Sequence, residues 1–152
     1  MGAHSVTTTL VGKDLGSAFT AAQREAEIEH GTDPYNGTIS TASGVSEFKD
    51  VSWGRMQARD LFNAAWAITD IFEEGIQVAE LRAVNRILRK HRIPKRLANT
   101  AVLMARQLEE SKRGTWIAAQ VPPLMRIQVL KRNGLAGKRG MKVWIVSGYA
   151  AS

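Results

Sequence analysis

The chain has 152 residues, of which 44% are hydrophobic and 23% are charged, a balance that fits one folded domain with a buried core and excludes an intrinsically disordered chain. It contains no cysteine, which excludes a disulfide framework, a thiol nucleophile and a cysteine-based zinc site. We expect no signal peptide and no membrane span, because no basic region precedes an apolar run at the N-terminus and no stretch approaches about 18 apolar residues.

The charges are divided unevenly between the two halves of the chain. Residues 1–80 contain 5 Lys and Arg against 12 Asp and Glu, a net charge of −7, whereas residues 81–152 contain 16 against 2, a net charge of +14. A positive field of this density attracts polyanions. The alternative is that the acidic half lies against the basic half, within one subunit or between subunits. Such pairing cancels only part of the basic excess, and exposed ion pairs stabilise a protein little.

The first two predicted elements are a strand and a helix. Residues 4–11 have the alternation and the β-branched side chains of a strand. Asp14 suits the N-cap of a helix, and apolar residues recur at helical spacing from there to Gly31, where the helix should end. The outer face of this helix is acidic, at Glu25, Glu27 and Glu29. The pair Glu25 and Glu29, with His30 and Asp33 close by, could in principle hold a metal ion or transfer protons. Carboxylates without a second cluster of ligands usually form a solvated surface, however, so we predict no metal site, no cofactor and no catalytic residue.

The segment after this helix predicts a turn. Pro34 cannot continue a helix, and the pair Asn36-Gly37 readily adopts positive φ, so the chain should reverse here. The β-branched residues that follow predict a strand at residues 38–41, with a second short strand at residues 45–48.

This turn also carries a resemblance to a group of proteins. Residues 35–39 (Tyr-Asn-Gly-Thr-Ile), together with residues 1–9, 22–31 and 147–150, resemble small, mostly uncharacterised proteins encoded by bacteriophages and prophages, with an N-terminal strand and helix before the turn. The resemblance implies a viral protein that acts in the cytoplasm of an infected or lysogenic bacterial host. It implies no established activity, and it does not extend to the middle of the chain.

Three helices are predicted in the middle of the chain. Apolar residues at steps of three and four predict the first over residues 55–74. The second, over residues 78–91, has an inner side of Leu81, Val84 and Leu88. Pro94 separates it from the third, which should end near Gly114.

The second and third of these helices form a predicted basic helical hairpin, residues 76–114. Arg82, Arg86 and Arg89 lie opposite the apolar side of the second helix, so we expect this face to be exposed rather than folded against the acidic first helix. A helix-turn-helix DNA reader is the alternative. The linker has no glycine, however, and the third helix offers few side chains that read base edges, so a helical hairpin with a basic turn is the better prediction.

The C-terminal part returns to strand character. Residues 115–121, 125–129 and 142–146 predict three strands. The segment at residues 131–140 contains three glycines and four cations, which predicts a flexible, basic hairpin tip. It is not a phosphate loop, because no Gly-Lys is followed by Ser or Thr and a strand follows where a helix N-terminus would be needed.

These elements predict a single α+β domain over residues 1–152. We expect an antiparallel sheet with helices on one face and the basic helical hairpin inserted between the N-terminal and C-terminal strands. One core should join the inward residues of the segments, which are Val6, Leu10, Phe19, Ile39, Leu61, Ile68, Leu88, Leu97, Ile127 and Ile145.

The sequence favours a binding protein over an enzyme, because no nucleophile-base pair, metal-ligand cluster or glycine fingerprint stands out. Our first hypothesis is that a basic surface binds the backbone of DNA or RNA. The residues expected to contact phosphates lie on the helical hairpin and in the C-terminal loop, at Arg82, Arg86, Arg89, Lys90, Arg92, Lys95, Arg96, Lys131, Arg132, Lys138 and Arg139.

The second hypothesis is a protein partner. The resemblance to phage proteins implies an inhibitor or modulator of an acidic host protein, such as a defence or transcription component. An apolar anchor such as Trp116 or Trp144 would then supplement charge. A homo-oligomer is compatible with the division of charge. Attachment to a membrane is not expected, because the apolar side of the second helix lacks an aromatic anchor.

Overall fold

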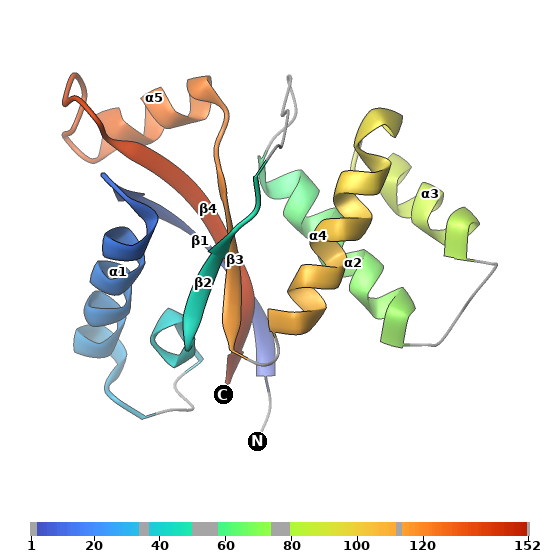
Figure 1. Ribbon diagram of the computed structural model, residues 1–152, viewed down its shortest axis with the longest axis horizontal. Coiled ribbons are helices and arrows are strands. Elements are labelled where there is room, and N and C mark those ends of the chain that lie inside the picture. Colours follow the sequence, from blue (N-terminus) through green and yellow to red (C-terminus); the bar gives the residue numbers. More distant parts are fainter. Residues whose placement is uncertain (1–2, 34–36, 50–57, 74–79, 112–113, 152) are drawn as a thin grey trace.

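The computed structural model describes residues 3–33, 37–49, 58–73, 80–111 and 114–151 (Figure 1). The strands are β1 (Ala3–Gly12), β2 (Gly44–Glu47), β3 (Thr115–Gln120) and β4 (Lys142–Ala151). The α-helices are α1 (Leu15–His30), α2 (Ala58–Glu73), α3 (Glu80–Lys90), α4 (Ala98–Glu110) and α5 (Pro123–Arg132). Short 3-10 helices lie at η1 (Ile39–Thr41) and η2 (Lys95–Leu97). The predicted α+β class is confirmed.

The four strands form one sheet in the order β1-β4-β3-β2. β4 pairs antiparallel with β1 and with β3, whereas β2 pairs parallel with β3. The sheet is therefore mixed, and the prediction of an antiparallel sheet is wrong in this respect. The reason lies in the connection between β2 and β3, which passes through α2, α3 and α4, because a parallel pair needs a long crossover of this kind.

Helices cover both faces of the sheet, so the prediction of helices on one face is also wrong. α1 and η1 cover one face and bury Trp116, Trp144 and Val146. α2, α3 and α4 cover the other face, where Ile117 and Ile145 point. Figure 1 shows α1 and the group of α2, α3 and α4 on opposite sides of the sheet. The physical cause is that β3 and β4 have continuous apolar runs, and both faces of such strands must be shielded from water.

The sheet divides the core into two clusters. Of the residues predicted to form one core, those on the α1 side are Leu10, Phe19 and Ile39, with Val6 packed beside them. Those on the other side are Leu61, Ile68, Leu88, Leu97 and Ile145. Ile127 belongs to neither cluster, since it is 58% exposed on α5. The prediction of one core is therefore wrong, because the sheet separates these residues.

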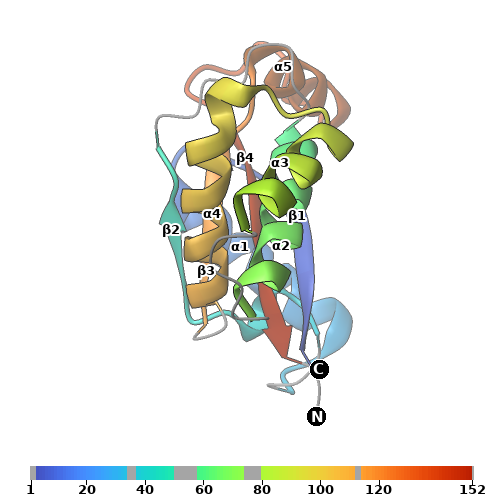
Figure 2. The ribbon, with the colours of Figure 1, turned by 90° about the vertical axis from the view of Figure 1, so that its right-hand side faces the viewer.

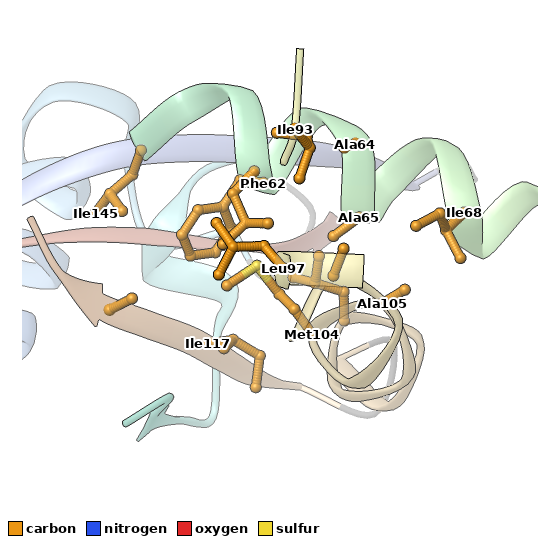
Figure 3. Packing of buried hydrophobic residues seen from close by; sticks show 14 of the residues in the cluster. Phe62, Ala64, Ala65, Ile68, Ile93, Leu97, Met104, Ala105, Ile117 and Ile145 are labelled. Atoms are coloured by element: carbon orange, nitrogen blue, oxygen red, sulfur yellow. The ribbon is translucent and has the colours of Figure 1, made fainter. Parts of the chain in front are cut away.

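The larger cluster joins α2 and α4 to the sheet (Figure 3). Phe62 of α2 is fully buried and lies between Ile145 of β4 and Met104 of α4. Ala65 of α2 and Ala105 of α4 lie between the two helices, where small side chains let the backbones approach closely. This packing fixes α4, and the basic turn before it, against the sheet.

The segment predicted as a strand at residues 125–129 is the helix α5. Pro123 lies in its first turn, where the backbone N–H groups make no hydrogen bond within the helix, so proline is tolerated there. Ile127 is exposed while Val129 is buried, which excludes a strand with both residues on its inner face. The alternation was too short to outweigh the helix-forming Leu, Met, Arg and Gln residues around it. The basic loop that follows is therefore a helix-to-strand connection and not a β-hairpin tip.

The segment predicted as a strand at residues 38–41 is the 3-10 helix η1. The Ser40 N–H donates to the Thr38 hydroxyl at 3.3 Å, a local bond that competes with strand pairing. Gln23 Nε2 of α1 donates to the carbonyls of Ile39 and Ala42, at 3.3 and 2.8 Å, and ties this turn to the helix. The predicted turn at Asn36 lies outside the described residues.

The middle of the chain follows the predicted order of helices. α2 and α3 occupy the predicted positions as far as the structure describes them, and the first residues predicted for both lie outside the described ranges. α3 and α4 each pack against α2, and the hairpin of residues 76–114 stays a prediction. None of the helices in the described ranges has the length and apolarity needed to cross a membrane.

Candidate nucleic-acid interface

α3 is an amphipathic helix with a cationic outer side. Val84 and Leu88 are buried in the cluster shared with α2, whereas Arg82, Arg86 and Arg89 are exposed. Steps of four and three residues place these arginines in one stripe. The stripe is about 10 Å long by helical rise, the axial length of about three nucleotide steps. The prediction that this face is exposed is confirmed.

Arg92 lies in a turn at the end of α3 that two backbone hydrogen bonds hold in place. The Ile93 N–H donates to the Leu88 carbonyl at 2.8 Å, and the Arg92 N–H donates to the Arg89 carbonyl at 3.2 Å, which is the Schellman pattern of helix ends. Ile93 and Leu88 are both buried, so the core anchors the turn. Arg92 occupies the position that needs a left-handed backbone, with a φ of 57°.

Glycine is the usual residue at this position, and α5 provides the comparison within the same chain. At the end of α5, the Leu135 N–H donates to the Leu130 carbonyl at 2.8 Å and the Gly134 N–H donates to the Lys131 carbonyl at 3.2 Å. Gly134 has a φ of 68°. At this position of the motif, a residue with a side chain, such as Arg92, costs about 1–2 kcal/mol more than glycine does in adopting the left-handed backbone. Backbone strain of this kind is found preferentially at functional positions.

η2 extends the cationic surface beyond the turn. Leu97 is buried, whereas Lys95 and Arg96, which precede it in η2, are exposed. Because Ile93 and Leu97 point into the core, the charged residues between them lie on the outside. The α3–η2 basic surface comprises Arg82, Arg86, Arg89, Lys90, Arg92, Lys95 and Arg96, all of which are exposed.

The remaining predicted site residues form a second, separate surface. The C-terminal basic loop comprises Lys131, Arg132, Lys138 and Arg139, all exposed at the end of α5 and in the connection to β4. Figure 1 shows this connection at the far left of the molecule and α3 at the far right. The structure therefore does not bring the two predicted sets of cations together. Lys131 and Arg132 also have a structural role, because cations in the last turn of a helix stabilise its dipole.

The acidic helix α1 does not neutralise the α3–η2 basic surface. Glu25, Glu27 and Glu29 are exposed on α1, on the opposite face of the sheet. Among the described residues, no ion pair joins these glutamates to Arg82, Arg86 or Arg89, and Glu29 instead lies 3.6 Å from His30. Pairing of the acidic and basic elements within one subunit is thus excluded for these helices.

Metal centres and acid-base pairs are arrangements that catalytic sites commonly use. The described residues contain no group of three His, Asp or Glu side chains that could hold a metal ion. A groove of about 410 Å³ between α4 and the sheet is lined by Ser46, Gln107, Glu110, Thr115 and Ile117. Among the described residues of this lining, Glu110 is the titratable one, and no described histidine accompanies it there.

The tryptophans proposed as anchors for a protein partner are buried. Trp116 and Trp144 are 0% and 1% exposed beneath α1. Trp144 Nε1 donates to Glu47 Oε1 at 2.8 Å, and Trp116 Nε1 donates to the Tyr149 carbonyl at 3.2 Å. Neither ring is available to a partner, and this part of the prediction is wrong.

The structure also exposes apolar side chains that the sequence did not reveal. On α5, Leu124 is 76% exposed and Ile127 is 58% exposed. They lie three residues apart on one side of the helix, in line with the exposed Lys131. Assigning this segment to a strand hid the pattern, which becomes visible only at helical spacing.

Comparison with known proteins gives no match to a protein-family model, to a curated protein or to a solved structure. The resemblance to phage proteins stays a prediction. The function is therefore argued from the geometry and the charge of these surfaces.

Proposed function

We propose that the protein binds nucleic acid, DNA or RNA, through phosphate contacts made by the α3–η2 basic surface. The observation that carries this proposal is the exposed stripe of Arg82, Arg86 and Arg89, on the sheet face opposite the acidic α1. Arginine suits phosphate because its planar guanidinium donates two parallel hydrogen bonds to it. A purely structural role does not account for the stripe. Stabilisation of the helix dipole concerns only the last turn, and Arg82 lies outside it.

The mode of binding follows from the side chains. Phosphate contacts carry no sequence information, so the protein should bind different sequences with similar affinity. Each phosphate neutralised on duplex DNA releases counterions and adds about 0.9 to the slope of log affinity against log salt. Affinity should therefore fall steeply with salt. We propose no catalytic step and no cofactor, and the resemblance to phage proteins supports action in the bacterial cytoplasm.

The test measures fluorescence anisotropy of labelled duplex DNA, single-stranded DNA and RNA at two salt concentrations. Arg86→Glu should weaken binding of every probe and reduce the salt slope. Arg24→Glu is the matched control, because Arg24 is an exposed arginine on α1 and its replacement changes the net charge equally. No binding by micromolar protein at physiological salt would refute the proposal, as would an equal effect of both substitutions.

A protein partner is the second candidate, and the exposed apolar side of α5 favours it. Leu124 and Ile127 form a small apolar area beside Lys131, which suits an acidic surface with an apolar centre, such as that of a host defence or transcription component. In this case nucleic-acid binding should be weak at physiological salt. Leu124→Asp should then abolish the capture of an acidic protein from nuclease-treated bacterial lysate, and Arg86→Glu should leave that capture intact.

A further inference from the structure

β1 is a long edge strand of the sheet. It has 10 residues, whereas strands usually have about five or six. It pairs with β4 on one side, and Figure 2 shows it at the margin of the sheet with no described strand beyond it. Edge strands of natural proteins are usually protected by lysine, proline, a bulge or shortness. β1 has no proline and no Lys, Arg, Asp or Glu, and its register with β4 is continuous.

The register shows which backbone groups of β1 face outward. Val121 N–H donates to the Val143 carbonyl at 3.1 Å, so Val143 bonds toward β3. Bonding directions alternate along an antiparallel strand, so Trp144 and every second residue after it bond toward β1. Trp144 pairs with Leu10, which means that the even-numbered residues of β1 bond to β4. The odd-numbered residues of β1, from residue 5 to residue 11, therefore direct their N–H and C=O groups away from the sheet.

The sequence of β1 is self-complementary about Thr8. Antiparallel pairing of two β1 strands centred there places Thr7 opposite Thr9 of the second copy, and Val6 opposite Leu10. These two central pairs join residues of the same kind, and such cross-strand pairs stabilise a sheet. The outer pairs of the same register, Ser5 with Val11 and His4 with Gly12, are not alike. The register also places odd-numbered residues opposite odd-numbered ones, so the outward N–H and C=O groups meet. Val6 and Leu10 lie on the α1 side of the sheet, and pairing them extends that apolar cluster across the contact.

We infer that β1 pairs with β1 of a second copy of this chain, antiparallel and centred on Thr8, so that two sheets join into one. Because the two-fold axis of such a pair is perpendicular to the sheet, both copies of α3 lie on the same side of the joined sheet. This inference concerns a different surface from the proposed nucleic-acid interface, and it is tested without nucleic acid.

Analytical ultracentrifugation of the wild-type chain and of Thr9→Pro gives the first test. Proline removes the outward N–H of Thr9, which is not needed for pairing with β4, so the subunit should keep its fold. Because the dimer is two-fold symmetric, the substitution removes two hydrogen bonds between the subunits, one from each Thr9 N–H. Dimerisation should therefore weaken by about tenfold or more. Circular dichroism confirms the fold of the variant. A wild-type chain that is monomeric throughout the micromolar range would overturn the inference, as would a folded Thr9→Pro variant that dimerises normally.

Cysteine cross-linking gives the second test and does not depend on the proline variant, since the chain has no cysteine of its own. Thr8→Cys places two thiols at the axis, at a Cα separation of about 4.5 Å that a disulfide can bridge. Ser5→Cys is the matched control on the same strand, because its two thiols would lie roughly 20 Å apart. Oxidation should cross-link the first variant and not the second. Equal cross-linking of both, or none of Thr8→Cys, would show that a different surface or a foreign strand occupies the edge.

Discussion

Replacement of Arg92 by glycine should stabilise the protein while weakening its binding to nucleic acid. Arg92 has a left-handed φ of 57°, a conformation that costs a residue with a side chain about 1–2 kcal/mol. Glycine removes this cost but gains freedom in the unfolded chain, which offsets about 0.5–1 kcal/mol. The net stabilisation is about 0–1.5 kcal/mol, or up to about 6 °C in melting temperature. The same substitution removes one cation from the α3–η2 basic surface, which should lower the salt slope by about one.

Arg92→Ala separates the two effects. It removes the same charge but keeps a Cβ atom in the left-handed conformation, so it should weaken binding as Arg92→Gly does without raising stability. Urea unfolding of the three proteins, with anisotropy titrations on one duplex, measures both quantities. The reasoning about backbone strain is refuted if the glycine variant is no more stable than the alanine variant. The proposed role in binding is refuted if both variants bind like the wild type.

The remaining predictions concern stability. Leu61→Ala removes a fully buried side chain and should lower the free energy of unfolding by about 2–5 kcal/mol in urea titrations; a loss within experimental error would contradict the assigned core. Gly148→Ala places a Cβ atom against the Trp116 ring, closer than van der Waals contact allows, and should cost about 1–3 kcal/mol or more, with altered tryptophan fluorescence as the second readout. The Ser17 N–H bond holds the pKa of Asp14 below its ordinary value, so the stability that the charged carboxylate adds is present at neutral pH and is lost as the pH falls below about 4. Asn at position 14 also caps the helix but does not titrate, so the difference in melting temperature between the wild type and Asp14→Asn should shrink as the pH falls. A difference that stays constant with pH would refute the contribution of the Asp14 carboxylate to stability.

The elements that were predicted correctly are those with a long periodic pattern of apolar and polar residues that matches which of their sides is buried. α3 has apolar and basic residues on opposite sides, and its exposed face was predicted because periodicity fixes which residues turn inward. Residues 125–129 were misassigned because a short alternation of apolar residues fits a strand as well as one side of a helix. Pro123 at the helix start was the signal that could have favoured α5.

The pairing of the strands and the arrangement of the helices on the sheet could not be predicted from local sequence patterns alone. The parallel pairing of β2 with β3 depends on where the chain returns after α2, α3 and α4, which no short segment encodes. The sequence does indicate that helices cover both faces of β4. Residues 143–146 are all apolar, whereas a strand with one face in water would alternate apolar and polar residues. The distance between the α3–η2 basic surface and the C-terminal basic loop follows from the sheet order and could not be obtained from the charges alone.

The acidic outer side of α1 and the basic outer side of α3 lie on opposite faces of the sheet, although α2, on the same face as α3, also carries acidic residues such as Asp70. β1 and β4 come from opposite ends of the chain yet pair side by side, while the glutamates of α1 and the arginines of α3 lie on opposite faces. Two layers of about 10 Å each place these charges roughly 20 Å apart, well beyond the screening length of about 8 Å at physiological ionic strength. The acidic helix therefore cannot cancel the attraction of α3 for a polyanion. The acidic α1 repels a polyanion, whereas α3 attracts it. The protein is therefore oriented with α3 toward the polyanion before any contact forms. For this reason the net charge of +7 understates the field that a nucleic acid meets at α3.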